Sequence, residues 1–175
     1  MKILHVLDHS LPLHSGYTFR TAAILTEQRR RGWETVHLTS PKQGASDALT
    51  EQAGGFEFHR TPYSPGWLSR VPMGWPLDEM RATESALADL ARQTRPDVLH
   101  AHSPALNAWP ALRVGRRLGI PVVYDVRAFW EDAAVDLGTS SEGGIRYRLT
   151  RQLETSALRR VDAVTTICEG LRADI

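Results

Sequence analysis

Segments patterned as β-strands alternate with segments patterned as α-helices along the whole chain of 175 residues. Short apolar stretches predict six strands, at residues 3–7, 35–39, 56–59, 98–102, 121–126 and 161–167. Strands that alternate with helices form a mostly parallel sheet covered on both faces. The pattern therefore predicts a doubly wound, Rossmann-like α/β domain with a six-stranded sheet. The third stretch alternates apolar and polar residues, which is typical of an edge strand.

Helix boundaries are marked by glycine, proline and apolar spacing. A helix is expected from Tyr17 to Arg31, with Gly32 as its C-terminal glycine. Before the last strand, Ile145, Leu149 and Leu153 recur at helical spacing and predict the buried face of another helix. The region 61–75 contains three prolines and three large aromatics, so it is too broken for regular structure.

The junction at residues 95–104 joins a buried strand to the start of a helix. Pro96 ends one helix, the strand carries His100 and His102 at its carboxyl end, and Ser103 is expected to cap the next helix, with Pro104 in its first turn. Because open α/β sheets bind ligands beyond the carboxyl ends of their strands, this junction is a candidate site.

Composition limits the partners and the compartment. The formal net charge of +1 gives no reason to expect a nucleic-acid partner. Arginine clusters at 29–31, 116–117 and 159–160 fall near expected helix ends, where they either complement the helix dipole or form a basic face for anionic lipid or diphosphate.

The single cysteine, Cys168, follows an apolar run and is expected to be packed; it excludes an internal disulfide. With no signal segment or membrane span recognised, the chain is expected to be cytoplasmic, with any membrane contact peripheral at the inner face.

Two common chemistries lack their sequence signatures. A dinucleotide fold needs clustered glycines directly after the first strand and an acid near the end of the second, and neither is present; a Walker A loop is absent too. No cofactor is therefore predicted. His100 and His102 share one face of their strand, with Asp8, His9 and Asp125 at neighbouring strand ends, so a metal-dependent hydrolase is an alternative. We predict no metal, because a single His-X-His is a weak signal.

Two further segments carry candidate chemistry. In the loop His14-Ser15-Gly16-Tyr17, helix-start amides would hold an anion and Gly16 would let a ligand approach the backbone; the alternative is a plain turn glycine. The segment 125–132 contains Arg127, Glu131 and Asp132. These three either form a structural ion pair or serve a substrate, with the arginine contacting phosphate or sugar and a carboxylate accepting a proton.

Taken together, these segments resemble the N-terminal domain of the family-4 glycosyltransferases, which are retaining enzymes with the two-domain GT-B fold. The resemblance is carried, in order, by residues 1–6, the Gly16 loop, 25–36, 95–102, 119–124 and Glu154 ahead of 161–165. Residues 124–132 look most like bacterial exopolysaccharide members, including those associated with exosortase systems.

The resemblance implies that residues 1–175 are the acceptor-side domain, and that a C-terminal nucleotide-sugar domain is absent from this chain. Sugar would move from a nucleoside-diphosphate sugar to a saccharide or lipid-linked hydroxyl, in polysaccharide or glycolipid synthesis. His14, Ser15, Gly16, Tyr17, His102 and Asp132 are the implied substrate-binding residues, and Arg127 and Glu131 the implied catalytic ones. A non-catalytic Rossmann-like binding domain is a further alternative.

The chain departs from the family pattern in two places. Many members have two adjacent glycines where this chain has Ser15-Gly16, and many have a histidine where it has Arg127. Arginine does not act as a base at neutral pH, so the role expected for Arg127 is electrostatic or positional.

Overall fold

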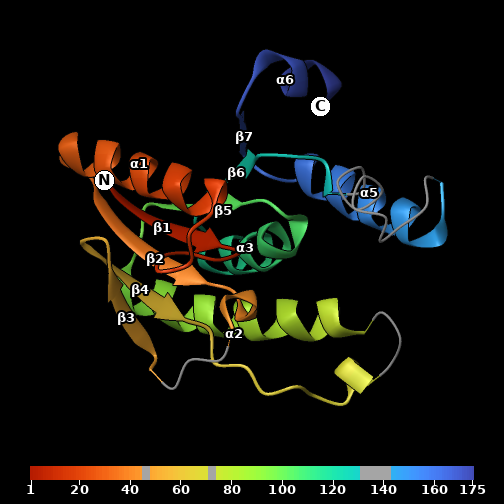
Figure 1. Cartoon of the computed structure of the whole chain (residues 1–175), viewed down its shortest axis with the longest axis horizontal. Coiled ribbons are helices and arrows are strands. Elements are labelled where there is room, and N and C mark those ends of the chain that lie inside the picture. The colour runs from red at the N-terminus through yellow and green to blue at the C-terminus, as the bar shows by residue number, and fades with distance from the viewer. Residues whose placement is uncertain (45–47, 71–73, 131–142) are drawn as a thin grey trace.

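The computed structural model describes residues 1–44, 48–70, 74–130 and 143–175. In this part of the chain the strands form one sheet in the order β3-β4-β2-β1-β5-β6-β7 (Figure 1). The strand bounds are β1 Lys2–Leu7, β2 Glu34–Thr39, β3 Thr50–Ala53, β4 Phe56–Arg60, β5 Val98–His102, β6 Val122–Val126 and β7 Ala163–Thr166. Neighbouring strands are parallel except β3 and β4. The mostly parallel α/β architecture is thus confirmed.

The sheet has seven strands rather than the predicted six. The additional strand, β3, pairs with β4 in antiparallel register across a turn at Gly54 and Gly55, both of which have positive φ. It takes the edge position, so the expectation that residues 56–59 form the edge is wrong. The sequence of β3 is polar and lacks an apolar alternation; the Gly-Gly pair was the available hairpin signal.

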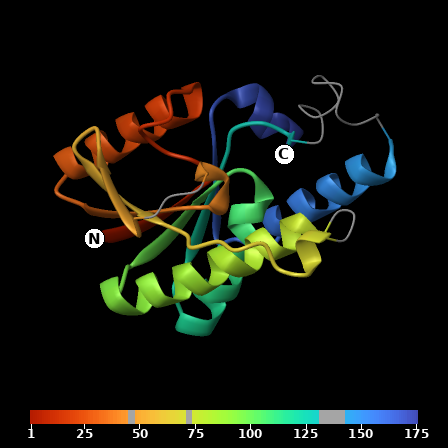
Figure 2. The same cartoon turned by 60° about the horizontal axis from the view of Figure 1, so that its bottom comes forward.

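The helices lie on opposite faces of the sheet. Their bounds are α1 Gly16–Arg30, α2 Trp75–Thr94, α3 Ala105–Leu118, α5 Ile145–Leu158 and α6 Glu169–Asp174, with short 3₁₀ turns η1 Pro41–Gln43 and η2 Leu68–Arg70. Helix α1 covers one face, while α2 and α3 pack together on the other (Figure 2). Helix α5 packs against α3.

The two faces of the sheet differ in chemistry. On the side of α2 and α3, Leu4, Val6, Leu99 and Ala101 are fully buried in the main apolar core. Alternate residues of the same strands point toward α1, and there β1 and β5 carry histidines instead. Because side chains alternate along a strand, one strand supplies both the core and a polar row.

Two local expectations at the junction after β5 and near the chain end are wrong. Pro104 is the N-cap of α3, and the Ser103 hydroxyl instead accepts a hydrogen bond from the Arg127 amide at 3.2 Å. Cys168 is exposed rather than packed.

The buried face of α5 matches the prediction only in part, because Leu153 packs against the main core. Ile145 and Leu149 are 78% and 50% exposed, whereas Glu154 and Ala157 are buried. The Glu154 carboxylate accepts hydrogen bonds from the Tyr124 hydroxyl and the Ala105 amide. A carboxylate that is satisfied in this way is tolerated inside the protein.

Across the described residues, no helix is both long enough and apolar enough to cross a bilayer.

Candidate functional site

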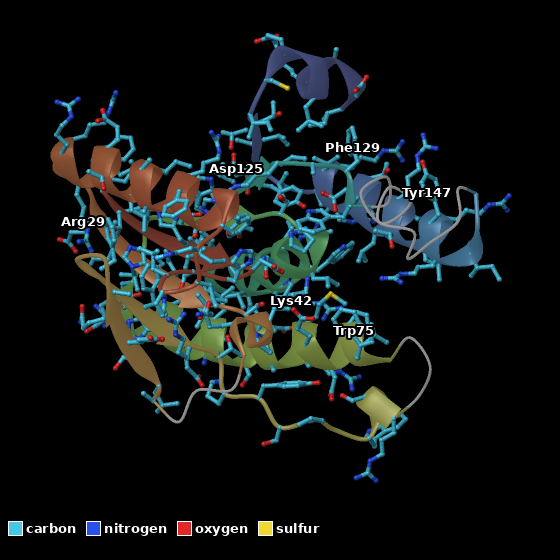
Figure 3. All side chains as sticks on the ribbon, viewed as in Figure 1. Arg29, Lys42, Trp75, Asp125, Phe129 and Tyr147 are labelled. Atoms are coloured by element: carbon cyan, nitrogen blue, oxygen red, sulfur yellow. The ribbon has the colours of Figure 1, made fainter. Side chains whose placement is uncertain are left out.

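The carboxyl ends of β1, β5 and β6 meet the start of α1 at one rim of the sheet. His102 closes β5 and is in register with Asp125 of β6. Figure 3 shows Asp125 beside the N-terminal end of α1. Tyr17, in the first turn of α1, has its ring centroid 6.5 Å from that of His102. The structure thus brings together Gly16, His102 and Arg127, three residues that the sequence assigned to one site.

Arg127 lies at the centre of this rim and is nearly buried, with 8% of its side chain exposed. Its Nε donates to Asp125 at 2.8 Å, and its Nη1 donates to the Tyr17 carbonyl and the Thr21 hydroxyl. Its Nη2 donates to His102 Nδ1 at 2.5 Å, and the guanidinium carbon lies 4.1 Å from the centroid of the Tyr17 ring. Arg127 therefore connects α1 to β5 and β6. Its ion-pair partner is Asp125.

The charges at this rim keep Asp125 ionised. Burial opposes ionisation of Asp125, but the hydrogen bond and the positive charge of Arg127 hold its pKa well below the usual range. A second arginine, Arg20, lies 3.8 Å from the same carboxylate and is 41% exposed. The site thus combines one buried carboxylate with two guanidinium groups.

A chain of hydrogen bonds runs from Arg127 across the sheet. Because a guanidinium only donates, the contact with Arg127 makes His102 Nδ1 an acceptor and places the proton of His102 on Nε2. That Nε2 donates to His5 Nδ1 at 2.9 Å, and His5 Nε2 then donates to Gln28 Oε1 at 2.9 Å. This assignment follows from the partners and fixes both ring tautomers.

Histidines form a row on the α1 side of the sheet. His37, His5 and His100 are register partners on β2, β1 and β5. Burial lowers the pKa of His37 to about 4, that of His100 to about 3 and that of His102 to about 4, and it holds the pKa of His5 well below 6.5. All four rings are therefore neutral at pH 7. Within the described residues, His5, His100 and His102 place ligand nitrogens within 4.8 Å of one another.

The loop before α1 is held by hydrogen bonds from Arg60 and leaves open space around Gly16. Ser15 caps the helix and forms a capping box with Thr18. Buried Arg60 holds the loop by donating to the Ser10 hydroxyl and the Leu11 carbonyl. Gly16 is not in the positive-φ region, and a Cβ added there would meet no atom within 4 Å. Neither backbone strain nor close packing of the protein therefore requires a glycine at this position.

Lys42 and Glu79 are charged residues that the sequence did not predict for this region. Lys42 Nζ forms an ion pair with Asp8 at 2.9 Å and lies 5.8 Å from the centroid of the Trp130 ring. Glu79 is 3% exposed, and burial raises its pKa. A dinucleotide-binding fold would have an acidic residue near the end of the second strand. Here the charged residue in that region is Lys42, in the η1 turn that follows β2.

The other predicted site residues have different placements. His14 is exposed, with its ring 5.4 Å from that of Phe19. Glu131 and Asp132 lie outside the described residues, so their predicted roles and their pairing with Arg127 remain predictions.

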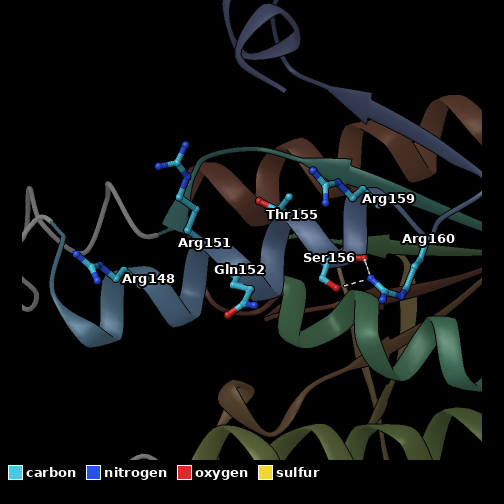
Figure 4. A pocket seen from close by; sticks show the side chains of 7 residues that line it. All are labelled: Arg148, Arg151, Gln152, Thr155, Ser156, Arg159 and Arg160. Carbon is cyan, nitrogen blue, oxygen red and sulfur yellow. Dashed lines mark hydrogen bonds between the residues drawn. The ribbon is translucent and has the colours of Figure 1, made fainter.

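A broad groove of about 810 Å³ lies on α5 rather than at this rim. Figure 4 shows the seven residues that line it, which are Arg148, Arg151, Gln152, Thr155, Ser156, Arg159 and Arg160. We place the candidate site at the rim and not in the groove, because the groove contains none of the buried carboxylate and imidazole groups described above.

Comparisons with known proteins agree on one family. Residues 15–175 match a family model described as a glycosyl transferase 4-like domain. Two curated relatives, from Mycolicibacterium smegmatis and Mycobacterium tuberculosis, are GDP-mannose-dependent alpha-mannosyltransferases. Each is 27% identical to this chain and aligns with 99% of it and with 44% of its own length.

Solved structures share the fold. Sucrose-phosphate synthase from Thermosynechococcus elongatus superposes with a TM-score of 0.70 at 14% identity, covering 98% of this chain and 43% of that one. A UGT transferase from Siraitia grosvenorii, in complex with UDP, superposes with a TM-score of 0.57 at 13% identity, covering 95% and 44%. The chain thus spans less than half the length of these relatives.

Proposed function

Because the chain belongs to the glycosyl transferase 4-like family, we propose that it is the acceptor-side half of a glycosyltransferase. The reaction would transfer a sugar from a nucleoside-diphosphate sugar to a hydroxyl acceptor with retention of configuration. We further propose a saccharide or lipid-linked acceptor in polysaccharide or glycolipid synthesis. The two curated relatives are named for GDP-mannose, so GDP-mannose is the donor to test first.

The open space around Gly16 is the main support for this proposal. Helix amides without intrahelical partners begin at this residue, and the first turn of α1 contains no acidic residue. Such a helix start favours an external anion, and a glycine there lets a diphosphate approach the backbone closely. Because the protein itself does not need a glycine at this position, ligand approach explains it better than folding does.

Arg127 has a positioning role in this proposal. Its donors are directed to protein acceptors, among them the Tyr17 carbonyl in the first turn of α1. It would therefore hold the helix start against β5 and β6 while charge develops on the leaving diphosphate. His102 accepts from Arg127 and its side chain is fully buried, so we propose that it acts at the acceptor side through Arg127 and not by contact with the acceptor.

The remainder of the reaction is assigned to a second domain. The curated relatives are more than twice as long as the aligned region, and we propose that the remaining part of a longer protein supplies the nucleotide-binding half. Strand β7 supports this arrangement, because three of its four residues are exposed. We expect residues 1–175 alone to transfer no sugar.

Substitution of Gly16 in the full-length enzyme tests the proposal. Gly16→Ala and Gly16→Val should lower kcat/KM for the donor by roughly 10-fold and 100-fold or more, because a methyl or isopropyl group would occupy the path of the diphosphate. Folding should be preserved, since replacing glycine at a relaxed helical position is neutral or stabilising by about 0.4–1 kcal/mol.

Gly170→Ala is the matched control, because Gly170 also lies in the first turn of a helix with no atom within 4 Å of its added Cβ. This variant should retain normal transfer. Steady-state kinetics with GDP-mannose and other nucleotide sugars, together with the anomeric configuration of the product by NMR, would decide the case. Normal donor kinetics in Gly16→Val would contradict the assignment of the loop.

A further inference from the structure

We propose that His5, His100 and His102 bind one zinc ion beneath α1. Adjacent parallel strands supply the three rings: His5 and His100 are register partners, and His102 follows two residues later on the same face of β5. Their ligand nitrogens lie within 4.8 Å of one another. Three histidines with a water as the fourth ligand are an established tetrahedral donor set for zinc, which prefers nitrogen and sulfur ligands. This site shares His102 with the rim described above, but its test by metal binding does not depend on sugar transfer.

An unsatisfied nitrogen is the second observation. His100 Nε2 is buried and has no hydrogen-bond partner in the structure. A buried polar atom without a partner is uncommon and needs an explanation, and a bound ion is one of the recognised explanations. In the tautomer of His100 that carries its proton on Nδ1, Nε2 offers a lone pair to a metal.

Two of the three rings, those of His5 and His102, have a protein oxygen near the nitrogen that would not bind the metal. His5 Nε2 donates to Gln28 Oε1 at 2.9 Å, which leaves Nδ1 for a metal. His102 Nδ1 lies 3.3 Å from Asp125 Oδ2. Histidine ligands of metals commonly direct their other N–H group to a carboxylate or carbonyl oxygen, which orients the ring. Asp125 and Gln28 are placed for that role.

Zinc binding would change the tautomer of His102 without adding or removing a proton. In the metal-free chain the proton of His102 is on Nε2 and is donated to His5. With zinc bound, that proton moves to Nδ1 and is donated to Asp125, while Nε2 becomes a ligand. Arg127 Nη2 then releases its contact with Nδ1, but its bonds to Asp125, Tyr17 and Thr21 remain available.

The required movements are small. Zinc–nitrogen bonds of 2.0–2.1 Å in a tetrahedron separate two ligand nitrogens by about 3.3 Å. The nitrogens of His5 and His102 start 2.9 Å apart, so they separate slightly while the His100 ring turns inward.

Metal titration of the full chain tests the proposal. Protein stripped with a chelator and dialysed should take up one Zn²⁺ per chain in isothermal titration calorimetry, with a Kd in the micromolar range or below. Co²⁺ should give the intense visible absorption of a tetrahedral site. Saturation with zinc should raise the Tm, because only the folded chain holds the three nitrogens together.

Zinc binding by two histidine variants distinguishes this site from the other buried histidines. His100→Gln removes the unsatisfied nitrogen and should weaken zinc binding at least 100-fold. His37→Gln is the matched control, because His37 belongs to the same buried row but bonds through both ring nitrogens to Glu57 and Thr35; it should bind zinc normally. Absence of stoichiometric zinc in the wild type, an octahedral Co²⁺ spectrum, or normal binding by His100→Gln would overturn the proposal. The wild-type titration and spectrum decide it even if a variant fails to fold.

Discussion

Arg127 lies where the sequence placed it, and its contacts support one of the two roles expected for it. The sequence placed it after the fifth predicted strand, where many relatives have histidine, and suggested an electrostatic or positional role. The structure supports the positional part, because four of its hydrogen bonds are directed to Asp125, Tyr17, Thr21 and His102. A histidine could not make these contacts, since it lacks the forked donors of a guanidinium.

Arg127→Ala should therefore destabilise the protein as well as lower its turnover. Removal of one partner of a buried ion pair leaves Asp125 uncompensated, and we expect the free energy of unfolding to fall by about 3 kcal/mol. Urea denaturation measures this change, with Arg20→Ala as the control. Arg20 faces the same carboxylate from a partly exposed position, so its loss should cost less than about 1 kcal/mol. Equal effects of the two substitutions would show that Arg127 does not hold the rim.

At the scale of elements, the sequence predicts the strands that consist of short, buried apolar runs. β1, β5 and β6 are short apolar runs, and all three are where the pattern places them. The buried side of α5 was not predictable, because its anchor is Glu154, a carboxylate whose partners, Tyr124 and Ala105, lie far away in the sequence. Strand β3 was missed for a related reason: a polar edge strand depends on hydrogen bonding to β4 and not on apolar side chains.

The histidine row predicts a specific loss of stability in acid. The pKa of His37, His100 and His102 is lowered to about 4, 3 and 4 in the folded chain. In the unfolded chain these residues titrate near 6.5. As the pH falls below 6.5, the unfolded chain therefore binds protons that the folded chain does not, and the free energy of unfolding decreases. The decrease amounts to at most about 1.4 kcal/mol per histidine for each pH unit, and it continues to about pH 4.

Chemical denaturation between pH 7.5 and 4.5, with chelator present, measures this dependence. His37→Gln should make the dependence shallower, because it removes one of the contributing rings. Carboxylates with lowered pKa, such as Asp125, add to the loss only below about pH 4, so the two effects are separable. A free energy of unfolding that stays constant from pH 6.5 to 4.5 would contradict the description of these rings as buried and neutral.

At the scale of the whole molecule, topology explains which parts of the site could be predicted. Parallel strands place their carboxyl ends at one rim, so Gly16, His102 and Arg127 were expected together and lie together. The histidine row and the hydrogen bond between His5 and His102 were not predictable, because they depend on the register between β1 and β5. A shift of one residue would have sent those rings to the opposite face.

The distribution of charge over the molecule also has a consequence. The net charge is only +1, yet Arg148, Arg151, Arg159 and Arg160 line one groove on α5, and Ile145 and Leu149 are exposed on the same helix. We propose that this outward side of α5 contacts an anionic membrane surface peripherally, which would suit a lipid-linked acceptor. Each arginine near such a surface contributes about 1 kcal/mol, and salt screens the attraction.

Flotation with vesicles tests that contact in the full-length protein. Vesicles of phosphatidylglycerol and phosphatidylcholine should carry the protein upward, whereas pure phosphatidylcholine vesicles or 0.5 M salt, which is about five times the ionic strength giving a 10 Å Debye length, should not. The double substitution Arg148→Ala and Arg151→Ala removes about 2 kcal/mol, so partitioning should weaken roughly 30-fold. Arg30→Ala with Arg31→Ala is the matched control, because Glu27 already neutralises that pair of arginines in part. If both double variants lose binding equally, net charge alone attracts the protein and α5 has no special role. If the wild type ignores anionic vesicles, the exposed arginines must serve a different partner, and the acceptor would have to reach the rim from solution.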